Sequence, residues 1–271
     1  MTHTLPYQLW LDSHALADDC MGAAYETLSG GERAVLKKCI ARQHVVWGEQ
    51  PGRERRSRTF RQGFGVEEDE GPASYVLLVC QASFASPAAF LAALMPALLA
   101  GASSVFPCFV PGPEEDAEPD APPPAPLLGA LELAGVERAF TATEAEVLIL
   151  AESLRALSAR GRIVLLGSPA FGESLALHAH RTGVLCRSLT QTPFYYSGRL
   201  CSVREQVFAR EADEPREEGE AMEPCPDDDN DLFLHLDASH EDVWFWPKLG
   251  PDWFRTRRMR LFSCSAGERL P

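Results

Sequence analysis

The chain has 271 residues, 45% of them hydrophobic, and a formal net charge of −14 at neutral pH. This length and apolar content indicate a globular protein with one α/β domain and extensions. Three acidic segments, at 67–70, 114–120 and 211–231, hold 20 of the 39 acidic residues and a single base, Arg216. Without these three segments, the rest of the chain has a formal net charge near +5. The acidic residues are therefore predicted to lie in solvated loops. With no basic stretch interleaved with aromatics, the sequence predicts no nucleic-acid partner.

Eight cysteines occur without any Cys-x-x-Cys pair, and most lie inside apolar segments. This usage favours reduced, buried thiols and a cytoplasmic location over a disulfide framework. The first residues form neither a basic leader nor an apolar core of signal-peptide length. The longest apolar run, 84–99, contains Pro87 and Pro96 and is too short to span a bilayer, so no membrane partner is predicted.

Residues 5–50 show helical spacing of apolar side chains, which predicts an N-terminal helical extension. Within it, LSGGE at 28–32 copies the signature of ATP-binding cassette proteins, but the chain has no GxxxxGK[ST] loop to hold phosphates. The simpler interpretation is a capping box in which Ser29 and Glu32 begin a helix. Residues 51–72, with five arginines between Arg53 and Arg61, are expected to form an exposed connection.

Residues 73–210 alternate helical and strand-like segments, the pattern of a parallel sheet. The predicted strands are 75–80, 105–110, 138–141, 163–166, 184–189 and 203–209. Gly101 and Gly135, each after an alanine, are predicted to end helices through a left-handed backbone. The proline-rich and acidic segment 111–126 and the acidic segment 211–231 are predicted loops, and 232–271 forms a tryptophan-rich C-terminal arm. The predicted fold is a three-layer α/β sandwich with a mainly parallel, Rossmann-like sheet.

The turn GSPAFG follows the apolar strand RIVLL and opens a helical pattern. Glycines at such a turn let backbone amides approach a phosphate or another anion. Gly167, Ser168 and Gly172 are therefore the candidate ligand-binding residues. A tight turn without a ligand remains the alternative.

The stretches MPALLAGASSVFPCFVP and PLLGALELAGVERAFTATEAEVLILAES, together with GSPAFG, resemble histidinol dehydrogenase and, more distantly, the aldehyde dehydrogenase superfamily. The resemblance covers about 120 of the 271 residues, all in the central α/β region. It implies a Rossmann-like fold and NAD or NADP as the cofactor. It also places Cys201, in SGRLCSVREQ, near the position of the aldehyde dehydrogenase nucleophile. The alternative for Cys201 is a half-buried cysteine that starts a strand.

The chain departs from both families at their functional residues. The zinc ligands of histidinol dehydrogenases find no counterpart among the seven scattered histidines, so no metal site is predicted. Pro107 or Cys108 stands where aldehyde dehydrogenases carry the lysine that contacts the cofactor ribose. The leading hypothesis is a catalytically reduced relative that binds a nucleotide, a small anion or a protein partner. Two alternatives stay open: an active NAD(P)-dependent oxidoreductase with Cys201 as its nucleophile, and a structural module that forms a homo-oligomer.

Two arginine clusters remain, at 53–61 and 255–260. They are expected to pair with acidic loops of the same chain or of a second subunit, although Arg side chains also suit a phosphate or carboxylate ligand. The aromatic run VWFWPKLGPDWF is interpreted as a segment docked on the core or at a dimer interface rather than as a ligand cage.

Overall fold

The computed structural model describes residues 6–81, 84, 86–111, 122–155, 160–189, 194–196, 199–201, 234–236, 243–246 and 248–263. The predicted strand at 203–209 and the acidic segments at 114–120 and 211–231 lie outside these residues. Within the described ranges, no helix combines the length and the apolar character that a membrane crossing requires.

A five-stranded parallel sheet forms the centre of the molecule. Its strands are β3 (Tyr75–Gln81), β4 (Val105–Val110), β5 (Phe140–Thr141), β6 (Gly161–Leu166) and β7 (Leu185–Ser188). They lie in the order β5-β4-β3-β6-β7, and every neighbouring pair is parallel. Each falls on a strand predicted from the sequence, and the predicted α/β class is confirmed.

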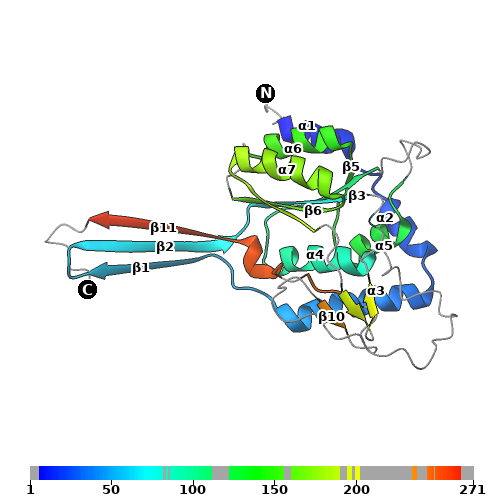
Figure 1. Ribbon diagram of the computed structural model, residues 1–271, viewed down its shortest axis with the longest axis horizontal. Helices are drawn as coiled ribbons and strands as arrows, with labels where there is room; N and C mark the ends of the chain where they lie inside the picture. Colours follow the sequence, from blue (N-terminus) through cyan, green and yellow to red (C-terminus); the bar gives the residue numbers. More distant parts are fainter. Residues whose placement is uncertain are drawn as a thin grey trace.

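Helices cover both faces of this sheet and complete three layers, as Figure 1 shows. On one face lie α1 (Pro6–His14), α6 (Glu144–Arg155) and α7 (Pro169–Thr182). On the other lie α2 (Cys20–Thr27), α3 (Gly30–Trp47), α4 (Pro87–Leu99) and α5 (Ala125–Leu133). Gly101 and Gly135 follow α4 and α5 with φ of 76° and 72°, so the predicted left-handed helix ends are confirmed.

The sheet separates two hydrophobic cores, because side chains alternate between the faces of a strand. On β3, Val76 and Leu78 join the core under α2–α5, and Leu77 and Val79 join the core under α1, α6 and α7. All four side chains are at most 1% exposed. Burying a side chain of this size stabilises a fold by about 1.5–3 kcal/mol.

The motif LSGGE forms the predicted capping box at the start of α3. The Ser29 hydroxyl accepts a hydrogen bond from the Glu32 backbone N–H at 3.2 Å, and the Ser29 N–H donates to the Glu32 carboxylate at 2.7 Å. These bonds hold the pKa of Glu32 below its usual value. The resemblance of LSGGE to a nucleotide-binding signature is thus explained by local helix chemistry.

The aromatic run near the C-terminus docks on the core, as one of its two interpretations expected. Trp244 and Trp246 are 1% and 2% exposed and belong to the same core as α4. The Trp246 indole N–H donates to the Ala89 carbonyl at 2.7 Å, and the buried Gln43 side chain donates to the Trp244 carbonyl at 2.8 Å. The segment therefore closes the face of the molecule formed by α3 and α4.

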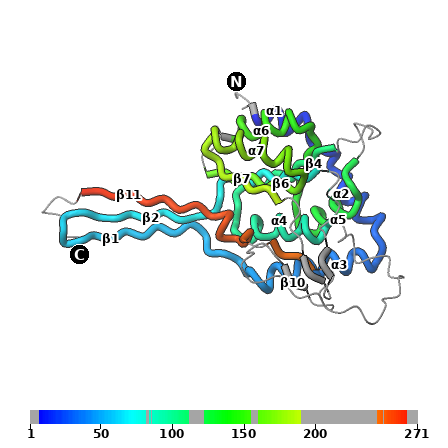
Figure 2. Tube along the Cα trace, in the orientation of Figure 1, coloured from blue at the N-terminus to red at the C-terminus, as the bar shows by residue number. Residues whose placement is uncertain are grey.

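A three-stranded antiparallel arm projects from the body (Figures 1 and 2). It consists of β1 (Glu54–Phe60), β2 (Phe64–Pro72) and β11 (Arg255–Ser263), in the order β1-β2-β11. The expected connection at 51–72 is exposed along β1, but most of it is a β-hairpin rather than a simple connection. The acidic segment 67–70 is the middle of β2 rather than a loop.

Charge pairs across the strands hold this arm together. Arg55 of β1 lies 2.8 Å from the Glu67 carboxylate, and Arg257 of β11 lies 2.9 Å from that of Glu68. Both arginine clusters thus pair with an acidic segment of the same chain, but as neighbouring strands. Because the pairs sit in solvent, each contributes about 1 kcal/mol or less.

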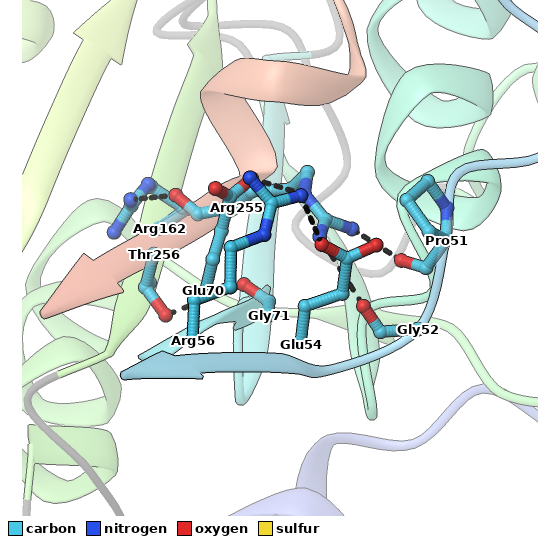
Figure 3. A network of polar contacts seen from close by, with 9 residues as sticks. All are labelled: Pro51, Gly52, Glu54, Arg56, Glu70, Gly71, Arg162, Arg255 and Thr256. Carbon is cyan, nitrogen blue, oxygen red and sulfur yellow. Dashed lines mark hydrogen bonds and ion pairs between the residues drawn. The ribbon is translucent and has the colours of Figure 1, made fainter. Parts of the chain in front are cut away.

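Two buried arginines fix the root of the arm to the body (Figure 3). Arg162 of β6 donates to the carbonyls of Trp253 at 2.7 Å and of Arg255 at 2.5 Å. Arg255 in turn donates to the carbonyls of Pro51 and Gly52 and to the Glu70 carboxylate. Asp69 accepts from Arg53 at 2.7 Å and from Arg160 at 3.2 Å.

The remaining described elements are short. The strands β8 (Phe194–Tyr196), β9 (Arg199–Cys201) and β10 (Leu234–Leu236) form a second small sheet in the order β10-β8-β9. The 3₁₀ helix η3 (Pro251–Phe254) leads directly into β11.

Candidate functional site

The order of the parallel strands defines one switch point at the carboxyl edge of the sheet. From β3 the chain adds β4 and β5 on one side, and then returns to add β6 and β7 on the other. The carboxyl ends of β3 and β6 thus border the point where the winding direction changes. In open α/β sheets, ligands bind at this switch point. Gln81 ends β3, and Gly167 follows directly after β6.

The predicted turn with Gly167, Ser168 and Gly172 therefore lies at the switch point. Ser168 caps α7 by accepting a hydrogen bond from the Phe171 N–H at 3.4 Å, and Pro169 fills the first helical position. Proline suits that position because its missing N–H would have no partner inside the helix. Pro169 and Ala170 are exposed, so the first turn of α7 is accessible to solvent.

Gln81 connects the two helices that begin at this edge. Its side chain is only 2% exposed. The amide oxygen accepts from the Ser168 backbone N–H at 2.5 Å, and the amide nitrogen donates to the Glu144 carboxylate at 2.7 Å. One buried carboxamide thus links the start of α7 to the start of α6, and leaves the Glu144 carboxylate exposed at the carboxyl edge of the sheet.

The two glycines of the turn each face a close neighbour. A Cβ on Gly167 would lie 2.4 Å from the Gln81 amide oxygen, and a Cβ on Gly172 would lie 2.4 Å from the Ser188 hydroxyl. Neither distance leaves room for a side chain. Packing inside the chain accounts for both glycines, whether or not a ligand also approaches the turn.

Chemically, the switch point offers two kinds of recognition, linked by Gln81. The N-terminus of a helix favours negative charge, which suits a phosphate next to α7. The Glu144 carboxylate accepts hydrogen bonds, which suits a hydroxyl group and repels a second anion. The arrangement matches a molecule that carries an anionic part and a hydroxylated part.

The predicted nucleophile, Cys201, ends β9, but its side chain lies outside the described residues. Four thiols in the described part of the chain, those of Cys20, Cys80, Cys108 and Cys186, are not activated. Burial raises the pKa of Cys186 to about 12 and raises those of Cys80 and Cys108 further. Burial, with help from Asp19, also raises the pKa of Cys20. A raised pKa keeps a thiol protonated and unreactive at neutral pH.

Among the described residues, no group of three or more His, Cys, Asp or Glu side chains is placed to hold a metal ion. His178 and His180 lie on α7, two positions apart. His240 and the side chain of His235 lie outside the described residues.

Sequence reasoning missed Gln81 and Glu144. The Gln81 side chain bonds Glu144 and the Ser168 N–H, and so links the starts of α6 and α7. One signal was present in the sequence, because the apolar strand YVLLVCQ ends in the polar residue Gln81. A polar group that is buried needs a hydrogen-bond partner. Its partners could not be named, since Glu144 and Ser168 are 63 and 87 positions away along the chain.

No protein-family model matches the sequence, and no curated protein matches it. Among solved structures, the chain is similar to a histidinol dehydrogenase from Elizabethkingia anophelis, at 13% identity and a TM-score of 0.48, over 68% of this chain and 41% of that one. It is also similar to 3,6-anhydro-L-galactose dehydrogenase in complex with NAP, at 16% identity and a TM-score of 0.42, over 70% and 39%. A third similar structure is an NAD-dependent benzaldehyde dehydrogenase from Corynebacterium glutamicum, at 13% identity and a TM-score of 0.39. The similarity covers 72% of this chain and 44% of that one. The chain spans about two fifths of the length of these proteins.

Proposed function

We propose that this protein binds a nucleotide at the switch point between β3 and β6, through the turn that contains Gly167, Ser168 and Gly172, and that its dehydrogenase chemistry is reduced. The observation that carries the proposal is the placement of this turn at the carboxyl edge of the sheet where the winding direction reverses. The accessible first turn of α7 is the place for a phosphate group.

Glu144 favours a nucleotide over a bare anion. A carboxylate beside the switch point repels a free phosphate, but it accepts hydrogen bonds from the hydroxyls of a ribose. A dinucleotide such as NAD or NADP contains both groups, and so does ADP. The buried Gln81 holds Glu144 in place through its 2.7 Å hydrogen bond, which fixes the spacing between the two recognition points.

The ligand test uses thermal shifts of the full chain with NAD, NADP, ADP and pyrophosphate. A ligand that binds only the folded state raises the melting temperature by mass action. The informative variant is Ala170→Asp, which adds a negative charge to the exposed first turn of α7. An acidic residue there is compatible with the helix, so the fold should be kept. Gly167 is unsuitable for this purpose, because any side chain there would strike Gln81.

The matched control is Ser174→Asp, an exposed position one turn further along α7 that receives the same charge. We expect a shift with the nucleotides that Ala170→Asp removes and Ser174→Asp retains. If no nucleotide shifts the wild-type chain, or if both variants keep the full shift, the switch point is not the binding site.

Whether catalysis persists depends on Cys201, which the oxidoreductase alternative requires. Thiol labelling at neutral pH, read by mass spectrometry with and without NAD or NADP, separates the two readings. A reduced relative predicts that Cys201 reacts no faster than an ordinary exposed thiol and that Cys201→Ala leaves nucleotide binding unchanged. Rapid labelling of Cys201 alone, altered by a dinucleotide, would instead favour the active enzyme.

A further inference from the structure

We propose that the outer edge of β11 is a docking site for an extended segment of a partner protein, in which acidic and apolar residues alternate. The site lies on the arm and is independent of the nucleotide proposal. In the described part of the chain, β11 pairs with β2 on one side and with no strand on the other. Its outer edge therefore presents backbone groups that can accept one more strand.

The side chains of β11 alternate in chemistry as well as in direction. Arg258 and Arg260 point to one face of the arm, and Met259 and Leu261 point to the other. Neither Arg258 nor Arg260 has a hydrogen-bond or ion-pair partner within the described residues. Met259 and Leu261 are 57% and 66% exposed. An added strand would meet Arg258 and Arg260 on one face, and Met259 and Leu261 beside the Arg257–Glu68 pair on the other.

The arm already contains the pairing that this edge would repeat. On its inner side β11 lies against β2, whose sequence VEEDEG is acidic, and Arg257 bonds Glu68 at 2.9 Å. On the far side of β2, Arg55 of β1 bonds Glu67 at 2.8 Å. An acidic strand is thus the neighbour that an arginine strand takes in this sheet. Opposite charges on adjacent strands stabilise a pair by about 0.2–1 kcal/mol each.

The same arginines disfavour a second copy of β11 as the occupant. Two identical strands that pair antiparallel about Met259 would place Arg258 opposite Arg260 of the other copy, twice. Like charges directly opposite each other destabilise a strand pair. The strand β11 has no acidic residue, whereas the three strands of the arm together have seven arginines and five acidic residues. Charge complementarity therefore selects an acidic partner.

The root of the arm makes this edge available in a fixed position. Arg162 and Arg255, each 7% exposed, bond β6, η3 and the chain before β1 to one another (Figure 3). Because the root is held, the arm extends away from the body (Figure 1) and does not have to be ordered again when a strand is added. Preorganisation of this kind lowers the entropic cost of binding.

The experiment measures binding of a fluorescein-labelled peptide of eight residues, alternating glutamate and valine, to the full chain by fluorescence anisotropy. The comparison peptide carries lysine in place of glutamate. The test variant is the double substitution Arg258→Gln and Arg260→Gln. Its matched control is Arg58→Gln with Arg61→Gln, which removes the same charge from two exposed arginines of the β1 side that also lack a described partner. Hydrogen exchange of the β11 amides is followed in parallel.

We expect the acidic peptide to bind at least 10-fold more tightly than the lysine peptide and to slow exchange of the β11 amides. The test variant should lose at least 10-fold in affinity, and the control less than twofold. Equal losses in both variants would mean general charge attraction, and unchanged exchange would mean that no strand is added. A third outcome is that the chain alone sediments with a mass that rises with concentration, while its β11 amides are protected from hydrogen exchange. That result would assign the edge to a second copy of the chain. Each of these three results overturns the proposal.

Discussion

Several glycines are required because a neighbouring side chain fills the space of a Cβ. At Gly161, the first residue of β6, a Cβ would lie 2.0 Å from the Tyr75 ring. At Gly65, on the arm, it would lie 2.3 Å from the Phe262 ring. Tyr75 is 1% exposed, and burial raises its pKa to about 12. The ring is enclosed by the core, so it cannot move aside.

Substitution Gly161→Ala tests this packing. The added methyl group must displace the Tyr75 ring or the strand, and overpacking of a core costs typically 1–3 kcal/mol. We expect urea denaturation to show a loss at or above the upper end of this range, and the additional change Tyr75→Leu to restore part of it. Gly22→Ala is the control, since nothing lies within 4 Å of a Cβ there and alanine is the better helix former. A Gly161→Ala protein as stable as Gly22→Ala would contradict the packing argument.

Local chemistry at the residue scale could be predicted from sequence, and long-range side-chain pairing could not. The capping box of Ser29 and Glu32 spans four residues, so its geometry follows from the helix alone. The turn at Gly167 was also placed correctly after its strand. The bonds of Gln81 depend on which strands become neighbours, and that information lies in the whole sheet rather than in the residues around it.

At the scale of elements, the arm is the clearest departure from expectation. Hydrophobic periodicity identified the buried strands β3, β4 and β6, because their apolar runs are the pattern of a parallel sheet. The strands β1 and β2 carry runs of arginine and of acidic residues, which show no such period. Their structure comes from charges that meet across strands, and a window along the sequence does not contain both partners.

The root of the arm should weaken in acid because of Asp69. The bonds from Arg53 and Arg160 hold the pKa of this carboxyl well below its usual value of about 3.9. A depressed pKa means that the stabilisation is complete above about pH 5 and is lost as pH falls toward the folded pKa. We expect the difference in urea midpoint between wild type and Asp69→Asn to be constant from pH 7 to 5 and to shrink below pH 4.

The control for this measurement is Asp18→Asn, which changes an exposed carboxylate without a hydrogen-bond or ion-pair partner among the described residues. Its difference from wild type should stay small at every pH. If the Asp69→Asn difference grows rather than shrinks below pH 4, the sign of the linkage is wrong and Asp69 does not clamp the root.

At the scale of the whole molecule, the C-terminal region completes both the body and the arm. Trp244, Trp246 and Leu249 are at most 2% exposed and join the core of α3 and α4, and η3 then carries the chain into β11. The expectation from the sequence was a tryptophan-rich C-terminal arm at 232–271. It did not foresee that Trp244 and Trp246 would be buried in the core, or that β11 would be the edge of a sheet shared with residues 54–72.

Substitution Trp246→Ala should therefore destabilise the whole fold. The change leaves a large cavity beside α4 and removes the 2.7 Å bond to the Ala89 carbonyl, and losses for a buried tryptophan are about 3–5 kcal/mol. Val45→Ala, at a position 85% exposed, should change the free energy of unfolding by less than about 0.5 kcal/mol. Thermal and urea denaturation followed by circular dichroism compare the two. A Trp246→Ala protein with a near-normal midpoint would show that the segment is not part of the core.

The arm is built from segments that lie far apart in the sequence, and this separation sets the time at which it can form. The hairpin of β1 and β2 closes over three residues, whereas contacts such as Arg257 with Glu68 join positions 189 apart. During synthesis from the N-terminus, the hairpin emerges long before its third strand. Until β11 is made, the edge of β2 that will pair with β11 has no neighbouring strand. The acidic side chains of β2 also repel one another. The arm is thus finished last, and a chain that stopped before residue 255 would carry its hairpin into solution with that edge of β2 open.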